Sequence, residues 1–162
     1  MIIHIDISEK FENKKTIGIA WITEDKKSHK GTALSGKIIK ELIKKQNINI
    51  NYPKLYSILV FLILHKNIEN VKKIVICNDY NFDKIDCYLR LLFLNYANYA
   101  KIEVMSIREY RSKLGFYFES YADGVAKSYR KRGLKPKRRE TGKKLNYIEV
   151  KYQEIINLWN KL

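Results

Sequence analysis

The chain opens with short apolar segments that alternate with polar ones. Three such segments, separated by short polar links, cover residues 2–7, 16–23 and 28–34. This spacing predicts three consecutive strands of an antiparallel meander. From Ser35 onward, apolar residues recur with the period of a helix, at positions 38, 39, 42 and 43. An amphipathic helix is therefore expected directly after the third strand.

Strands and helices alternate in the rest of the chain. Helices are expected at 54–66, at 83–96 and at 146–162, and strands at 71–78 and 101–107. A polar and aromatic stretch is expected at 108–117, followed by a helix that ends at about Arg132. Helix 54–66 follows Pro53 and is apolar on nearly all sides, which predicts a central, covered position. The continuous apolar run of strand 71–78 favours parallel pairing. The predicted fold class is α/β, with a mixed five-stranded sheet (a three-strand antiparallel meander plus two parallel strands) flanked by helices on both faces.

Composition narrows the class of protein. With 162 residues, 46% of them hydrophobic, the chain is long and apolar enough for one core, which excludes collagen-like and low-complexity proteins. The longest apolar run, 58–64, is too short to span a bilayer, and the first residues lack the features of a signal peptide. Cys77 and Cys87 have no second pair, so neither a zinc site nor a disulfide is expected. The expected location is the cytoplasm.

Positive charge is the strongest compositional feature. Lys and Arg number 32 against 17 acidic residues, a net charge of +15 that predicts a polyanionic partner, with nucleic acid the commonest. Ten basic residues fall in one segment opposed only by Glu140: Lys127, Arg130, Lys131, Arg132, Lys135, Lys137, Arg138, Arg139, Lys143 and Lys144. They are the predicted phosphate contacts, although a solvated linker would have the same composition. We divide the chain into a domain at 1–133 and a basic linker with a C-terminal helix at 134–162.

Three aspartates occupy positions at which a carboxylate could bind a metal ion. Asp6 lies in the middle of the first strand, where an unpaired charge is costly. Asp79 ends strand 71–78, at the edge where open α/β sheets bind ligands, but could also cap the next helix. Asp123 lies in a helix between the small residues Ala122 and Ala126, where it could also be an ordinary surface residue. Carboxylates that converge from distant parts of a chain suit Mg²⁺ or Mn²⁺.

These motifs resemble those of the ribonuclease H-like superfamily, which includes ribonucleases H and Holliday-junction resolvases. The resemblance covers about residues 1–133. It rests on the meander whose first strand carries Asp6, on the second aspartate, Asp79, at the end of the fourth strand, and on the Ala-Asp-x-x-Ala pattern at 122–126.

The resemblance implies a two-metal-ion endonuclease. Asp6, Asp79 and Asp123 would bind two Mg²⁺ or Mn²⁺ ions, and a metal-activated water would cleave a phosphodiester. The family usually has a glutamate early in the helix after the third strand, whereas helix 54–66 has no acidic residue in its first turns. Glu41, or Glu119 one helical turn before Asp123, is the candidate substitute.

Several functions stay open from sequence alone. The resemblance implies cleavage of the RNA strand of RNA/DNA hybrids, and a structure-selective, resolvase-like DNA nuclease fits the same residues. A protein of the same fold that binds nucleic acid without cleaving it also fits, because the helix glutamate is missing. Membrane binding is not expected, since the polar face of helix 146–162 carries too few basic residues.

Overall fold

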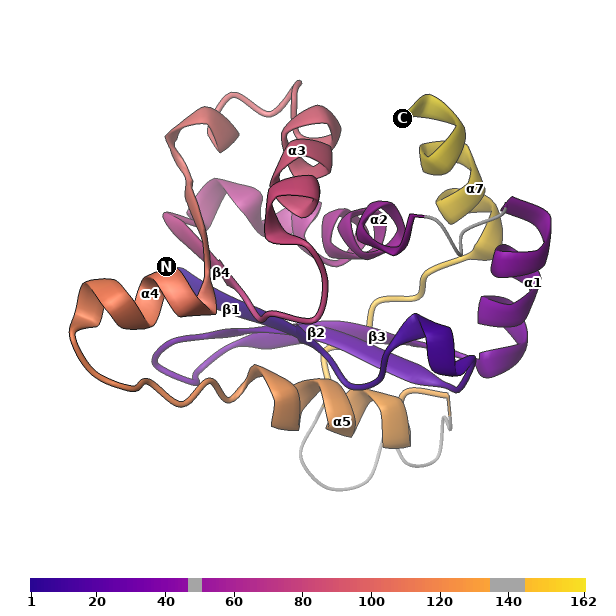
Figure 1. Cartoon of the computed structure of the whole chain (residues 1–162), viewed down its shortest axis with the longest axis horizontal. Helices are drawn as coiled ribbons and strands as arrows, with labels where there is room; N and C mark the ends of the chain where they lie inside the picture. Colours follow the sequence, from indigo (N-terminus) through magenta and orange to yellow (C-terminus); the bar gives the residue numbers. More distant parts are fainter. Residues whose placement is uncertain (47–50, 135–144) are drawn as a thin grey trace.

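A mixed five-stranded sheet runs through the centre of the computed structural model, which describes residues 1–46, 51–134 and 145–162 (Figure 1). The strand order is β3-β2-β1-β4-β5. The strands are β1 (Ile2–Ile7), β2 (Ile17–Thr23), β3 (His29–Leu34), β4 (Lys73–Ile76) and β5 (Glu103–Ser106). β2 is antiparallel to β1 and β3, whereas β4 is parallel to β1 and β5. The predicted α/β class, the meander and the parallel pairs are confirmed.

Helices cover both faces of this sheet (Figure 1). They are α1 (Gly36–Gln46), α2 (Tyr52–Leu64), α3 (Phe82–Leu92), α4 (Ile107–Leu114), α5 (Ala122–Arg132) and α7 (Tyr152–Lys161). Short 3-10 helices occupy Phe11–Asn13, His65–Asn70 and Tyr99–Lys101. In the described ranges, no helix combines the length and the apolar character needed to cross a membrane.

The larger core lies between the sheet and α2. Nine side chains of α2 are buried, so the predicted central position of this helix is confirmed. Ile3, Ile5 and Ile7 of β1 belong to this core, together with Ile155 of α7. Because side chains alternate along a strand, His4 and Asp6 of β1 lie on the opposite face, which α5 covers.

Helix α5 packs unusually close to the sheet. Ala126 and Tyr129 of α5 contact Ala20 of β2, and all three side chains are fully buried. At Gly18 of β2 a Cβ atom would lie only 2.1 Å from the carbonyl oxygen of Ala126. Glycine and alanine at this crossing therefore bring the first turn of α5, with Asp123, close to β1.

Several predicted boundaries are wrong; the expected helix 83–96, for example, ends at Leu92. Residues 107–114 form α4 rather than an irregular stretch, with Ser106 as its N-cap and Gly115 in the left-handed conformation at its end. The helix that carries Asp123 begins at Ala122. The final helix begins at Tyr152 instead of 146, because Tyr147 forms a parallel bridge with Gly31 at the free edge of β3. The predicted basic linker falls mainly on 135–144, outside the described residues.

Candidate functional site

Asp6 is a carboxyl group buried at the centre of the sheet. β1 lies between β2 and β4, and the side chain of Asp6 is only 8% exposed. Its Oδ1 accepts a hydrogen bond of 2.8 Å from the backbone N–H of Ile7. One such bond does not satisfy a buried carboxylate, so Asp6 needs a further partner.

Asp79 supplies that partner. β4 is parallel to β1, so the two strands end at the same edge of the sheet, and the N–H of Cys77 still donates to the carbonyl of Ile5 at 3.1 Å. The turn that follows brings the carboxyl group of Asp79 into hydrogen-bond contact with that of Asp6. The expectation that these two acids converge agrees with this geometry.

The contact changes the acidity of Asp6. Burial raises its pKa to about 8, with the hydrogen bond and negative charge of Asp79 acting in the same direction. The N–H of Ile7 opposes the rise, and the charge of Asp123 adds to it weakly. At neutral pH the pair therefore holds a proton between two carboxyl groups that repel each other when both are ionised.

Asp123 lies near this pair but its side chain has another partner. It occupies the first turn of α5, is 48% exposed, and forms an ion pair of 2.7 Å with Lys127. Its charge still acts on Asp6. Within the part of the chain that the structure describes, no three His, Cys, Asp or Glu side chains are placed to hold a metal ion together. The structure thus brings Asp6 and Asp79 into contact and leaves Asp123 on the facing helix.

The two candidate glutamates lie elsewhere. Glu41 is on the exposed surface of α1, where it forms an ion pair of 3.0 Å with Lys45. Glu119 is exposed in the connector between α4 and α5 and precedes the helix, so the argument that it lies one helical turn before Asp123 is wrong.

Two residues near the acid pair were not predicted from sequence. Cys77 directly follows β4, and its thiol forms hydrogen bonds with Asp6 and Ser120. Burial, more than the charge of Asp6, raises its pKa. Tyr56 of α2 is fully buried, and its hydroxyl has no hydrogen-bond partner among the described residues.

The phenol of Tyr56 lies within the electrostatic range of the acids. Burial raises the pKa of Tyr56 well above its usual value, and the charges of Asp6, Cys77 and Asp79 add to this. A tyrosine in an otherwise apolar helix was the sequence signal that could have identified it. It stands in the helix where the resemblance implies a glutamate.

The connector between α4 and α5 is anchored beside Asp6 through His4. The His4 ring stacks on Phe118, with 5.0 Å between ring centroids, and its Nε2 lies 3.3 Å from a carboxylate oxygen of Glu24. Tyr110 of α4 donates a hydrogen bond to the same Glu24 oxygen. Burial lowers the pKa of His4 although Glu24 opposes the shift. His4 therefore acts as a structural residue that holds α4 and the connector near the acid pair.

The predicted basic residues are only partly described. Lys127, Arg130, Lys131 and Arg132 all lie on α5, so four predicted contacts share one helix. Arg130 is tied to the loop after β1, because its guanidinium donates to the carbonyl of Ser8 at 3.3 Å and lies 3.8 Å from Glu9. The remaining residues of this prediction lie outside the described ranges: Lys135, Lys137, Arg138, Arg139, Lys143 and Lys144.

No family model, curated protein or solved structure matches the chain. Its function is therefore inferred from the geometry of the acid pair and its surroundings.

Proposed function

We propose that the chain is a divalent-metal-dependent nuclease of ribonuclease H-like fold that hydrolyses phosphodiester bonds, with the RNA strand of RNA/DNA hybrids as its substrate. The contact between Asp6 and Asp79 carries this proposal. The mixed sheet agrees with the layout that the resemblance implies, and the net charge of +15 suits a nucleic-acid substrate.

The residues at the site fit a hard divalent cation. Two carboxyl groups in contact repel each other when ionised, and a cation between them removes that repulsion. Their oxygens are the ligands that Mg²⁺ and Mn²⁺ prefer. The buried hydroxyl of Tyr56 has no hydrogen-bond partner among the described residues, and the charges of both acids act on it. Asp6 and Asp79 would hold the first ion, with Asp123 completing the site for a second.

The bound ions would supply Lewis-acid stabilisation of the phosphate and a water of lowered pKa. The protein contributes the arrangement of its own groups. Asp6 must lose its proton before it can bind a cation, and Asp123 must leave its ion pair with Lys127. The ammonium of Lys127 is then available to a phosphate oxygen beside the acids.

Cleavage assays with Asp79→Asn test this proposal. Labelled RNA/DNA hybrid, duplex DNA and four-way junction are incubated with Mg²⁺ or Mn²⁺. We expect cleavage of the hybrid by the wild type and at least a hundredfold slower cleavage by Asp79→Asn, because removal of a group in the reacting centre costs on the order of 3 kcal/mol or more.

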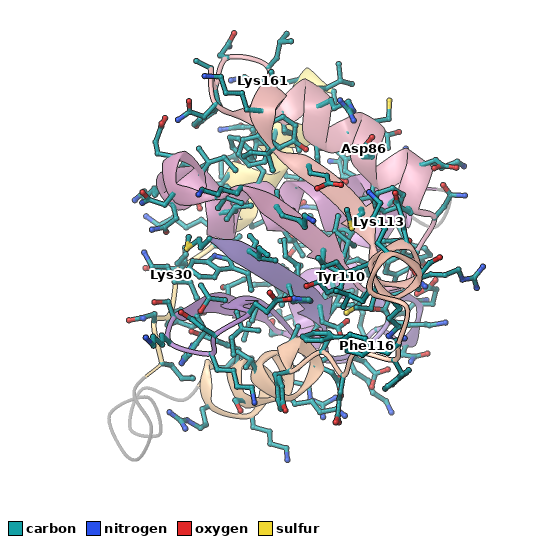
Figure 2. All side chains as sticks on the ribbon, turned by 90° about the vertical axis from the view of Figure 1, so that its left-hand side faces the viewer. Lys30, Asp86, Tyr110, Lys113, Phe116 and Lys161 are labelled. Atoms are coloured by element: carbon teal, nitrogen blue, oxygen red, sulfur yellow. The ribbon has the colours of Figure 1, made fainter. Side chains whose placement is uncertain are left out.

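Asp86→Asn is the matched control. Asp86 lies on α3, paired with Arg90 at 2.9 Å, and is labelled in Figure 2. This variant should cleave like the wild type. Equal activity of Asp79→Asn and wild type would contradict the mechanism, and cleavage of the junction alone would make the substrate structured DNA instead.

A second candidate function is nucleic-acid binding without cleavage. The ion pair of Asp123 with Lys127, and the absence of an acid in the first turns of α2, favour it. Salt-sensitive binding of the same substrates, with no cleavage and no heat of Mn²⁺ binding, would support this candidate over the nuclease.

A further inference from the structure

A cavity of about 260 Å³ lies apart from the acid pair, between α5 and the hairpin that joins β2 to β3. The residues that matter for its chemistry are Lys26, His29, Tyr121, Gly124, Ser128 and Arg132. No acidic residue is among the described residues that line it. The volume is below the roughly 300–1,000 Å³ of usual ligand pockets, so a single base or nucleotide suits it better than a larger molecule.

The cavity and the acids lie on opposite flanks of α5. Ala126 and Tyr129 mark the face of the helix that packs on the sheet. With about 100° between successive residues, Asp123 lies on one flank of that face, Ser128 and Arg132 lie on the other, and Gly124 points away from the sheet at the rim of the cavity. An α-helix with its side chains is about 10 Å wide. A nucleic-acid strand that crosses α5 can therefore reach the acid pair and the cavity at once.

The lining suits an anionic group joined to a flat aromatic one. The ammonium of Lys26 lies 3.4 Å from the centre of the Tyr121 ring, and Tyr121 is 46% exposed. The guanidinium of Arg132 adds a second positive charge to the wall. The neighbouring acids of the hairpin are engaged elsewhere, since Asp25 accepts from Thr23 and Glu24 from Tyr110.

The connector that leads from α4 to the cavity continues this character. Phe116 and Tyr117, in the connector that ends at Tyr121, are 62% and 73% exposed. The guanidinium of Arg111 lies 4.1 Å from the centre of the Tyr117 ring. Figure 2 shows Phe116 on this connector, near the outer surface. Exposed aromatic rings beside cations are the surfaces on which unpaired bases stack.

We propose that this cavity receives one unpaired nucleotide of a strand that lies across α5, with its base against Tyr121 and its phosphate near Lys26 and Arg132. The proposal rests on the proposed function and narrows its substrate to RNA/DNA hybrids with at least one unpaired nucleotide beside the cleavage site. A fully paired duplex cannot fill the cavity without flipping a base out of its stack.

Gly124→Phe tests the cavity without changing any charge. At Gly124 a Cβ atom would meet no other atom within 4 Å, so a larger side chain enters open space. Gly124→Ala is the matched control, because it also replaces the glycine in the helix but leaves the cavity open. Binding of a labelled 12-nucleotide single strand and of the corresponding duplex is measured by fluorescence anisotropy in the Asp79→Asn background, with folding checked by circular dichroism.

We expect Gly124→Phe to bind the single strand about tenfold more weakly, as loss of one stacked base predicts, and to bind the duplex like the control. Unchanged affinity, or equal losses for both substrates, would overturn the proposal. A free mononucleotide that displaced the labelled single strand when present at the same concentration would also overturn the proposal. Anisotropy measures binding without cleavage. If the wild type cleaves none of the substrates but Gly124→Phe still weakens binding of the single strand, the cavity proposal stands and the nuclease proposal is refuted.

Lys26→Ala tests the phosphate contact. It should reduce the slope of log K against log salt by about one, whereas Lys161→Ala should not change it. Lys161 lies on α7, far from Phe116 in Figure 2. Identical slopes for wild type and Lys26→Ala would contradict the phosphate assignment.

Discussion

At the scale of single residues, the acid pair combines two opposing requirements. Asp6 is buried, which favours its neutral form, yet cation binding needs its charged form. The carboxyl group of Asp79 increases this conflict, because it brings a second negative charge. The charged form of Asp6, which cation binding needs, therefore destabilises the metal-free protein.

Asp6→Asn should change how stability depends on pH. The pKa of Asp6 is about 8 in the folded chain and about 3.9 in an unfolded one, so the folded state holds the extra proton between these values. The stabilisation is complete below about pH 4 and is lost as the pH rises through about 8. Without metal, the wild type should lose on the order of a few kcal/mol between pH 5 and pH 8 relative to Asp6→Asn.

Urea unfolding with a chelator, at pH 5 and pH 8, measures this difference. Asp86→Asn should follow the wild type at both values. If Asp6→Asn and the wild type lose the same stability between the two pH values, Asp6 does not hold a proton in the folded chain.

At the scale of elements, the position of the site depends on how closely α5 approaches β2. The carbonyl of Ala126 and the backbone N–H of Arg130 lie directly over Gly18, at 2.1 and 2.5 Å from where a Cβ atom would stand. Any side chain at Gly18 must push α5, and with it Asp123, away from β1.

Gly18→Ala should therefore destabilise the chain by about 1–3 kcal/mol, the usual cost of overpacking. Gly124→Ala, on the exposed side of the same helix, should instead stabilise it by about 0.5–1 kcal/mol, because alanine favours helix more than glycine does. Midpoints of chemical denaturation compare the two variants. Equal stability of Gly18→Ala and wild type would show that α5 does not pack against β2 as described.

Strands were easier to predict from sequence than helix ends. Residues 2–7 were assigned correctly because an apolar run bounded by polar residues is a strong local signal. Helix α4 was missed because its exposed face, with Arg108 and Glu109, has the composition of a loop, although Ser106 and Gly115 marked both of its ends. The start of α7 could not be predicted, since it depends on the pairing of Tyr147 with Gly31, far away in the sequence.

At the candidate site, too, some features can be predicted from sequence and others cannot. The meeting of Asp6 with Asp79 follows from parallel strands that end at one edge, and this rule needs only the order of elements. The positions of Tyr56 and Cys77 depend on the reach of side chains across packed layers, which sequence spacing does not contain. For the same reason, sequence did not predict that Asp123 pairs with Lys127.

At the scale of the whole molecule, one helix separates two candidate contacts for a nucleic-acid strand. α5 carries Asp123 on the flank toward the acid pair and lines the cavity with Ser128 and Arg132 on the other. The C-terminal segment contributes Val150 and Ile155 to the larger core between the sheet and α2. Tyr147 joins this segment to the edge of β3. This arrangement places the acid pair and the cavity on either side of one helix, on a chain with a net charge of +15.

Calorimetric titration of the metal-free protein with Mn²⁺ at pH 7, in two buffers of different ionisation enthalpy, tests the central claim most directly. The wild type should bind Mn²⁺ saturably and release about one proton, because the cation displaces the proton of Asp6. Asp79→Asn should lose this heat. No saturable binding by the wild type, or equal binding by Asp79→Asn, would contradict the assignment of these two carboxyl groups as a metal site.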